Sequence, residues 1–401
     1  MGDSLSVYYG EFAVSPVPLE LSFNYCSHKC AYCFANLNLP GRKADIKKTM
    51  RLLADYQNRE TLEATLLKQG YPVLVSNRVD PFAASNFKQA VPVIRVMAEM
   101  GIPVAIQTKG GLGIADVLEF LPPSVWYVSI SMLDDAVRNR IEPGAPAIDE
   151  RFRLIETLTN RGHKVTLGLN PIVPEWLPDP MPLLKRAQAA GVRGVWIEPL
   201  HLNKKQQANL SAREIINILK PVLDRAKRRK TATEDLTAYC RARECAQAIG
   251  LEIFSIGQMN ASDYFKPYRE LYPKTFPTNQ DFVNWCHSQP ETVRQEIYFD
   301  DYAEVMLPKL PEGVHPISSY IRATSYWITE THKIPNRMSF RQLLALTWAE
   351  HRTQQHIGHI GCFAALGKQD PDGWIEVVDD NDLPVFAFSP SGFSEYFKEV
   401  N

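Results

Sequence analysis

The sequence has no excess of either charge. Its 44 Lys and Arg residues face 45 Asp and Glu residues, which leaves a formal net charge of −1. A chain that attracts nucleic acid or a membrane through its net charge needs a clear excess of positive residues. Any surface of this chain that binds either partner must therefore be a local patch of positive charge. Hydrophobic residues make up 45% of the 401 residues and charged residues 22%. These values are typical of a globular chain with room for one large and one smaller domain.

The sequence also lacks a long apolar run and a secretory signal. No uninterrupted apolar stretch is long enough to span a bilayer. The first residues, MGDSLSVYYGEFAV, contain neither a basic segment nor an apolar one. We therefore expect a cytoplasmic protein with no membrane partner.

Cysteine is scarce and unevenly placed. Three of the seven cysteines, Cys26, Cys30 and Cys33, are spaced C-x3-C-x2-C, and the next one is Cys240. Such clustering in an unsecreted chain favours metal ligation over disulfides, although three incidental buried thiols are the simpler alternative. A structural zinc site needs four protein ligands. Three thiolates on a cubane iron–sulfur cluster would instead leave one iron open to a small molecule.

Short apolar runs alternate with amphipathic stretches over the first 256 residues. The predicted strands are Leu19–Tyr25, Val73–Asn77, Pro103–Thr108, Trp126–Ser131, Lys164–Asn170 and Val195–Pro199, with a further short run at Leu251–Ser255. The helical patterns between them include Ala84–Met100 and Asp149–Arg161. Apolar strands that alternate with helices predict an α/β fold with a partial (β/α)6 barrel, and a doubly wound sheet is the main alternative. The cysteine triplet follows the first strand, at the end where such barrels carry their active sites.

The chain changes character after residue 257. An aromatic, proline-spaced stretch is followed by residues 338–366, which are predicted to be helical, with Ser339 and Gln342 as a capping box. Two strand-like runs around Asp379–Asp382 predict a hairpin, so this C-terminal helical and β-hairpin extension could be winged-helix-like. We predict four segments: an N-terminal arm (1–17), the barrel (18–256), an irregular connection (257–335) and a helix–hairpin module (336–401).

The loop CSHKCAYC resembles the cluster loop of the radical S-adenosylmethionine (SAM) enzymes, which reads C-x3-C-x-aromatic-C. The resemblance implies a [4Fe–4S] cluster held by Cys26, Cys30 and Cys33, with SAM on the open iron. Cleavage of SAM by an electron from the cluster would then give a 5′-deoxyadenosyl radical that abstracts hydrogen from a substrate. An electron donor such as flavodoxin or ferredoxin would be a partner. The difficult chemistry belongs to the cofactor, and the protein supplies orientation and a site without water.

A narrower resemblance covers about residues 17–200. The stretches VSNRVDPF (75–82), IQTKG (106–110), VSISMLDD (128–135) and RIEPGAPAIDERFRLIETLTNRGHKVTLGLNPIVP (140–174) are similar to the spore photoproduct lyase subgroup, whose members act on thymine dimers in DNA. By position, the resemblance implies that Lys109 meets the SAM carboxylate. The other implied cofactor residues are Ser76, Asn77 and Asp80, near the methionyl amine, and Ser129 and Ser131, on the fourth strand.

Several of these residues also have plain structural explanations. Lys109 could be a turn lysine, and Asp80 before a proline could belong to a turn. Glu142, in EPGAP, is a candidate catalytic residue or a structural turn residue. Glu198 and His201 follow the sixth strand and either face substrate or cap a helix.

One departure from the subgroup bears on the reaction. True spore photoproduct lyases carry a hydrogen-donating cysteine near the end of the second strand, and this chain has none between residues 33 and 240. We therefore expect isomerisation or hypermodification of thymine or a modified thymine in DNA, as in related phage radical SAM isomerases. The alternatives are dimer repair, radical modification of a peptide or small metabolite, and a non-enzymatic iron–sulfur protein.

Other features are weaker. The run DRAKRRK (224–230) is a solvated helix face or a phosphate contact. An auxiliary metal site is conceivable, and its ligands would be His356, His359, Cys362, Cys240 and Cys245. The aromatic residues at four-residue spacing either pack in the interior or stack on bases, and they are Tyr264, Tyr268, Tyr272 and Phe276.

Overall fold

The fold is that of a computed structural model. It describes residues 6–7, 19–21, 23, 25–33, 46–75, 79–200, 202, 206–207, 220–222, 236–255, 257–258, 261–263, 265–316, 337–349, 360–370, 373–393 and 398. The chain divides into two compact units. Unit 1 comprises residues 1–5, 20–54 and 73–254, and unit 2 comprises residues 6–19, 55–72 and 255–401. No helix among the described residues is long and apolar enough to cross a membrane.

Unit 1 contains a sheet whose strands follow one another in chain order. The strands are β2 (Leu19–Leu21), β3 (Val73–Val75), β4 (Val104–Thr108), β5 (Val125–Ser129), β6 (Lys164–Ile172), β7 (Gly194–Pro199) and β8 (Glu252–Ser255). Each pair from β3–β4 to β7–β8 is parallel. A doubly wound sheet would reverse its strand order at a switch point, so the sequential order excludes that alternative. The predicted partial barrel is confirmed.

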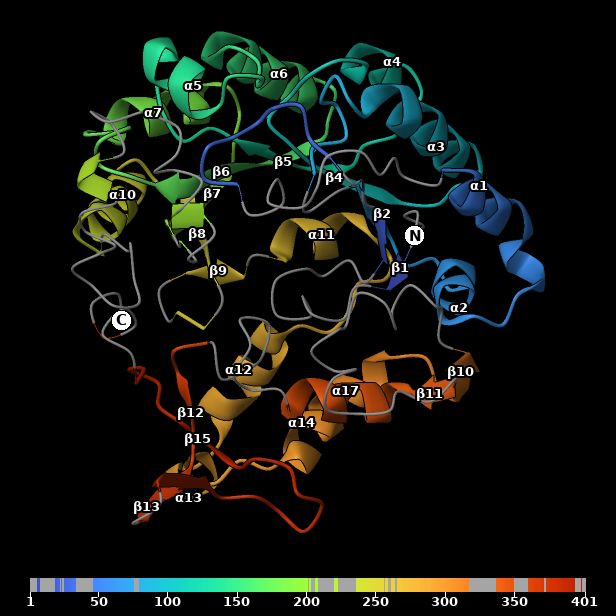
Figure 1. The fold of residues 1–401 in the computed structure, drawn as a ribbon, viewed down its shortest axis with the longest axis vertical. Coiled ribbons are helices and arrows are strands. Elements are labelled where there is room, and N and C mark those ends of the chain that lie inside the picture. Colours follow the sequence, from blue (N-terminus) through green and yellow to red (C-terminus); the bar gives the residue numbers. More distant parts are fainter. Residues whose placement is uncertain are drawn as a thin grey trace. The chain divides into compact units, whose positions relative to one another are not determined.

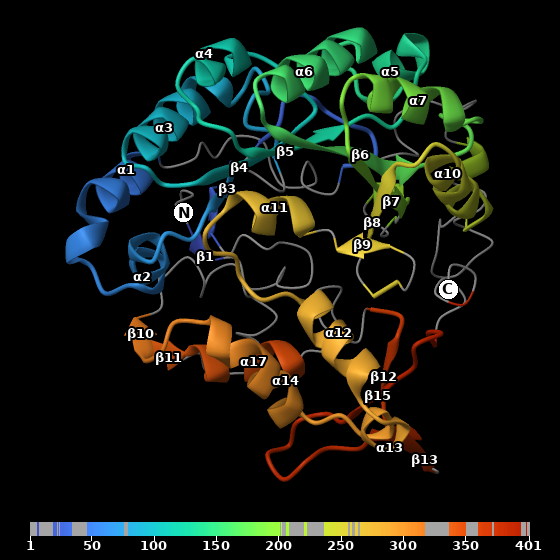
Figure 2. The same cartoon turned by 180° about the vertical axis from the view of Figure 1, so that it is seen from behind.

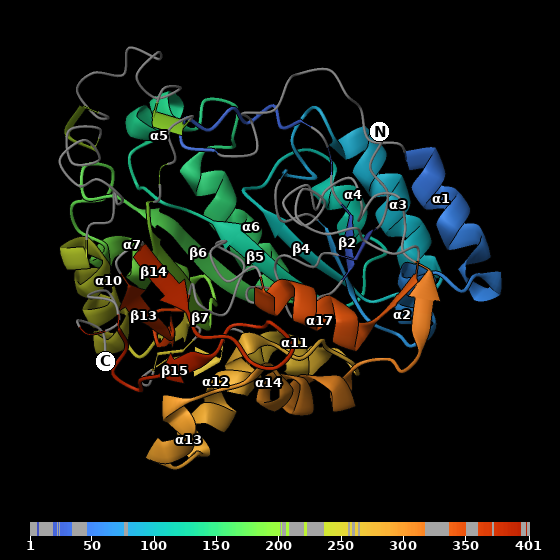
Figure 3. The same ribbon diagram turned by 60° about the horizontal axis from the view of Figure 1, so that its bottom comes forward.

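Helices cover one side of this sheet (Figures 1 and 2). They are α1 (Ile46–Asp55), α3 (Phe87–Glu99), α4 (Ile114–Leu118), α5 (Asp135–Ile141), α6 (Ile148–Asn160), α7 (Met181–Ala189) and α10 (Leu236–Ala248). In α3 the buried residues are Ala90, Val93, Ile94 and Met97, which is the spacing of one apolar helix face. Figure 3 shows β4, β5 and β6 side by side, so the loops after these strands meet at one edge of the sheet.

Unit 2 is built from short elements. Its helical segments are η3 (Tyr56–Asn58), α2 (Leu62–Lys68), α11 (Lys266–Leu271), α12 (Asn279–Ser288), α13 (Glu291–Gln295), α14 (Phe299–Met306), η4 (Leu307–Lys309) and α17 (Phe340–Ala349). Its strands are β1 (Ser6–Val7), β9 (Ser262–Asp263), β10 (Val314–Pro316), β11 (Arg337–Ser339), β12 (Phe363–Ala365), β13 (Gly367–Asp370), β14 (Gly373–Glu376) and β15 (Phe386–Phe388). Rings from three helices and two strands form its core. We call this core the aromatic cluster, and it consists of Phe282, Phe299, Tyr302, Trp348, Phe363 and Phe386.

The C-terminal prediction is correct in part. The capping box exists, because the Ser339 amide donates to Gln342 Oε1 at 2.9 Å and the Gln342 amide donates to Ser339 Oγ at 3.2 Å. The helical prediction for residues 338–366 is wrong at its end, because Phe363–Ala365 is a strand. The predicted hairpin around Asp379–Asp382 is present, with an antiparallel bridge between Val378 and Pro384 and a hydrogen bond of 3.0 Å from the Val385 amide to the Val377 carbonyl. The strands on either side of it pair elsewhere, β14 with β13 and β15 with β12.

Candidate functional site

The cysteine triplet lies in a loop that is fixed to the segment after α5. The Ala31 amide donates to the Ile141 carbonyl at 2.7 Å, and the Gly144 amide donates to the His28 carbonyl at 2.9 Å. Gly144 is needed for this approach, because a Cβ there would lie 2.1 Å from the Ser27 carbonyl oxygen. Cys26 and Cys30 are buried, and Cys33 is partly exposed.

His28 holds the cluster loop from inside. Its Nδ1 lies 2.9 Å from the Gly144 carbonyl, and its Nε2 lies 3.1 Å from the Gly110 carbonyl and 3.2 Å from Asp80 Oδ2. Every partner is an acceptor, so both ring nitrogens donate. Burial opposes the charge, but Asp80 outweighs it and raises the pKa of His28 above its usual value.

Asp80 connects this histidine to the end of β4. Its carboxylate accepts from the Lys109 amide at 2.6 Å, from the Phe82 amide at 2.9 Å and from the Thr108 hydroxyl at 2.9 Å. Burial opposes ionisation, and His28 with these donors lowers the pKa of Asp80 below its usual value. The structure therefore gives Asp80 a clear part in fixing the cluster loop. Its predicted contact with the methionyl amine stays a prediction.

Lys109 lies beside Ser129 and Glu142. Its Nζ donates to Ser129 Oγ at 2.7 Å and lies 3.0 Å from Glu142 Oε1. The Lys109 side chain is 15% exposed, whereas Glu142 is completely buried. Lys109, Ser129 and Glu142 are thus together, although they come from three different segments of the chain.

Glu142 is the centre of a group that we call the charged cluster, which consists of Tyr32, Lys109, Glu142 and Arg151. Arg151 Nη2 lies 2.6 Å from Glu142 Oε2, and the Tyr32 hydroxyl donates to Glu142 Oε1. Burial opposes the negative charge, but Lys109 and Arg151 hold the pKa of Glu142 well below its usual range. A carboxylate held ionised in this way is poorly suited to donate a proton. The cluster instead links the cysteine loop, through Tyr32, to Lys109.

The remaining predicted residues have varied surroundings. Ser131 is completely buried, and its hydroxyl has no hydrogen-bond partner among the described residues. Ser76, Asn77, His201, Tyr264, His356, His359 and the run 224–230 lie outside the described residues. Glu198 is partly exposed at the end of β7. Tyr268, Tyr272 and Phe276 are buried in unit 2, which favours packing over base stacking.

The donor set fits a cubane cluster and SAM. Among the described residues, no three His, Cys, Asp or Glu side chains converge as they would on a single ion. A cubane places each thiolate on a separate iron, so its ligands need not converge on one point. Burial, followed by the charge of Asp80, raises the pKa of Cys26 to about 12, so iron binding would release protons. The unpartnered Ser131 hydroxyl and the Lys109 ammonium are groups that a polar ligand such as SAM could satisfy.

Sequence reasoning missed His28 and Arg151 as parts of the site. Arg151 had a signal, because it falls on the apolar face of α6 with Ile148, Phe152 and Ile155. A charged residue in such a position is seldom buried without a partner. His28 had only its place between two cysteines as a signal.

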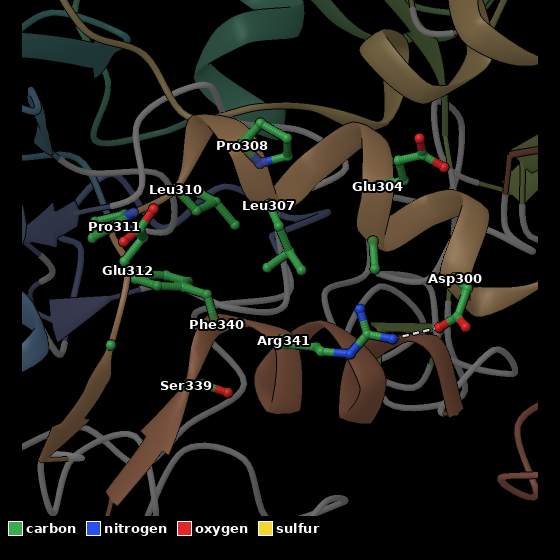
Figure 4. Close-up of a pocket in the computed structure, with 12 residues that line it drawn as sticks. Asp300, Glu304, Leu307, Pro308, Leu310, Pro311, Glu312, Ser339, Phe340 and Arg341 are labelled. Atoms are coloured by element: carbon green, nitrogen blue, oxygen red, sulfur yellow. Dashed lines mark hydrogen bonds and ion pairs between the residues drawn. The ribbon is translucent and has the colours of Figure 1, made fainter.

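Unit 2 has its own cavity, of about 600 Å³ (Figure 4). Phe340 and Arg341 line it from α17, and Arg341 pairs with Asp300. Glu304 and Glu312 also line it, so its lining carries three carboxylates and one guanidinium. This charge balance is unfavourable for a phosphate backbone.

Comparisons with known proteins match part of the chain to one family. Residues 21–187 match the family described as the radical SAM superfamily. The uncharacterized proteins Rv2578c of Mycobacterium tuberculosis and Mb2609c of Mycobacterium bovis are each 29% identical to this chain over 196 residues. The match covers 44% of this chain and 56% of each relative, so the chain spans little more than half the length of the curated relatives.

Solved structures are more distant. A spore photoproduct lyase mutant with a dinucleoside spore photoproduct is 13% identical, with a TM-score of 0.41 over 53% of this chain and 65% of that one. Another mutant of that lyase is 12% identical, with a TM-score of 0.45 over 63% and 80%. SuiB of Streptococcus suis bound to S-adenosylmethionine is 17% identical, with a TM-score of 0.32 over 52% and 44%.

The family match begins in β2 and ends in α7, so it contains the cysteine loop, Lys109 and the whole charged cluster. Residues 21–187 thus match the radical SAM superfamily, whose members use a [4Fe–4S] cluster and S-adenosylmethionine.

Proposed function

We propose that this chain cleaves SAM reductively at a [4Fe–4S] cluster held by Cys26, Cys30 and Cys33, and that its substrate is thymine or a modified thymine in DNA. The position of Lys109 is the main support for the proposal that the chain binds and cleaves SAM. Its ammonium group lies within the family match, next to Ser129, and is joined through Glu142 and Tyr32 to the cysteine loop.

The protein's own residues bind and orient. Lys109 supplies a positive charge for the SAM carboxylate, and Ser129 and Ser131 supply hydroxyl groups. Glu142 keeps Lys109 and Tyr32 in one arrangement, and His28 with Asp80 fixes the loop that carries the thiols. When bound, the cluster and SAM would supply a 5′-deoxyadenosyl radical that abstracts hydrogen from the substrate.

Anaerobic reconstitution tests the cluster. The parent chain should bind about four irons and four sulfides and release 5′-deoxyadenosine when reduced. Cys26→Ala should lose the cluster and all SAM cleavage, whereas Cys245→Ala, on α10 outside the triplet, should keep both. A Cys26→Ala protein that cleaves SAM at the parent rate would refute the assignment. About eight irons in the parent would indicate an auxiliary site.

A substitution at Lys109 tests the cofactor contact. Lys109→Met keeps an unbranched side chain that is one atom shorter and removes the charge, so SAM should bind more weakly while iron content stays constant. Titration of the cluster's electron paramagnetic resonance signal with SAM measures both. An unchanged affinity of this variant for SAM would show that Lys109 is a structural turn residue and does not contact the cofactor.

The substrate proposal rests on the stretches that resemble the spore photoproduct lyase subgroup. The missing donor cysteine favours isomerisation or another rearrangement over dimer repair. DNA that carries an amino-acid-modified thymine should therefore react, and DNA that carries spore photoproduct should yield no repaired thymine, as measured by mass spectrometry of nucleosides. Efficient dimer repair would overturn the isomerase proposal.

Because the net charge is −1, DNA must be bound by a local basic surface. The cavity beside Arg341 is acidic, so the basic run at 224–230 is better suited to phosphates than the region after Met338. Affinity for DNA should fall steeply with salt. No binding at low salt would favour a peptide or small-metabolite substrate.

A further inference from the structure

One face of β5 points toward the proposed SAM site. Ser129, the last residue of the strand, accepts a hydrogen bond from Lys109 Nζ at 2.7 Å. Side chains two residues apart on a strand share a face, so Tyr127 lies on the same face as Ser129. Trp126 lies on the opposite face, where its ring stacks on Phe82 with centroids 5.9 Å apart.

The Tyr127 ring reaches across to the neighbouring strand. Gly168 on β6 is the register partner of Ser129. A Cβ at residue 168 would lie 2.0 Å from Tyr127 Cζ and 2.2 Å from its hydroxyl oxygen. The hydroxyl end of the ring therefore occupies the space that a side chain at 168 would fill. Glycine weakens a strand interior and often marks such a close approach.

A second aromatic side chain continues this face. Trp196 on β7 is the register partner of Gly168, and paired residues of neighbouring strands share a face. Ser129, the Tyr127 ring over Gly168, and Trp196 therefore lie in adjacent positions across three strands. Tyr127 is partly exposed, although the other four residues of β5 are buried.

We propose that Tyr127 and Trp196 form an aromatic binding site for the planar ring of the substrate, a nucleobase, beside Lys109. This inference rests on the proposed function. A base that reacts must leave its stack in DNA, and an aromatic side chain can replace the lost stacking. Gly168 allows the tyrosine ring to lie where the ring of a base could stack on it.

The test compares oligothymidylate with an abasic oligonucleotide of equal length, by fluorescence anisotropy. Both oligonucleotides offer the same phosphates, so the ratio of their two dissociation constants measures how much the bases contribute to binding. The parent should prefer oligothymidylate, and Tyr127→Ala should reduce that preference by roughly 10-fold. Tyr127→Phe keeps the ring and should stay near the parent. All variants should bind SAM with parental affinity.

Gly168 offers a variant that displaces the ring without removing it. Gly168→Ala should lower the base preference as Tyr127→Ala does. The double variant should be no worse than Tyr127→Ala alone, because the two changes act on one feature. It also removes the steric conflict, so a folding defect of Gly168→Ala would not hide the result.

Two results would overturn the inference. The first is an unchanged base preference in Tyr127→Ala while the parent still binds DNA, which would leave the proposed function intact. The second is a loss of SAM affinity with the base preference kept, which would assign the ring to the adenine of SAM. A parent that cleaves SAM but binds neither oligonucleotide would refute the DNA substrate itself, and the base site with it.

Discussion

Both units bury apolar side chains, but the charged cluster lies in unit 1 and the aromatic cluster in unit 2. In unit 1 the charged cluster places Glu142, completely buried, 3.0 Å from Lys109 and 2.6 Å from Arg151. In unit 2 the aromatic cluster surrounds Trp348, whose ring centroid lies 4.9 Å from that of Phe386 and 5.1 Å from that of Tyr302.

The charged cluster and the aromatic cluster contribute to the fold in different ways. Apolar burial stabilises a fold without demanding one orientation. A buried ion pair contributes little net stability, because its desolvation offsets the attraction, but losing one partner is costly. Unit 1 therefore fixes the positions of a few charged groups beside the cysteine loop, whereas unit 2 gains stability from ring packing.

The largest expected effect is in unit 2. Trp348→Ala should lower the free energy of unfolding by about 4 kcal/mol, because it leaves a cavity between four rings and removes the Nε1 donor of the Pro384 carbonyl. The matched control is Trp285→Ala, where the ring is partly exposed and stacks on Phe282. Urea unfolding measures both, and equal losses would show that the aromatic cluster is not the source of stability.

Much of the fold could be predicted from the sequence. Apolar strand runs such as Lys164–Asn170 are local patterns, and the observed β6 differs from that run only by two residues at its end. The helical prediction includes residues 363–365, because FAA has no alternation that would mark a strand. These residues form a strand because they pair with β15, which lies more than 20 residues further along the chain.

The site could be predicted only in part. The cysteine spacing is a local signal, and family resemblance pointed to Lys109 and Ser129. The charged cluster is different, because Tyr32 and Glu142 are 110 positions apart in the chain and meet only through tertiary structure. The sequence could mark Glu142 as unusual but could not reveal which partners hold it.

A substitution in the charged cluster should cause the second largest loss of stability. Glu142→Gln keeps the shape and an acceptor for Tyr32, but leaves the buried Arg151 and the partly exposed Lys109 without their counter-charge. We expect a loss of about 3 kcal/mol in the free energy of unfolding. Glu119→Gln is the control, because Glu119 is 74% exposed and lies 3.4 Å from Arg161, and such surface pairs contribute less than about 1 kcal/mol. Similar losses in both variants would contradict a special role for buried charge in unit 1.

A neutral buried group in unit 1 should make stability depend on pH. His163 Nδ1 accepts from the Ser124 amide at 3.0 Å and from Trp126 Nε1 at 3.2 Å. Burial, with the charge of Arg161 second, lowers the pKa of His163 to about 4. In the unfolded chain it is about 6.5, so the unfolded state binds more protons between these values.

The contribution of His163 is therefore full above about pH 6.5 and is lost progressively as the pH falls to about 4. We expect a loss on the order of 2 kcal/mol over this window, seen as the difference between parent and His163→Gln in urea unfolding at several pH values. Parallel curves for the two proteins would refute the assignment.

The smallest effect returns to unit 2, at the start of α17. The Ser339 hydroxyl accepts from the Gln342 amide, which would otherwise be an unpaired donor of the first helical turn. Ser339→Ala should cost about 1 kcal/mol, and Ser339→Asp, which keeps an acceptor, should cost little. The helix carries Trp348, so the loss should appear in the same unfolding transition as Trp348→Ala. A loss of the same size in both Ser339 variants would mean that the cap is not what stabilises this end, and that the aromatic cluster alone holds the helix in place.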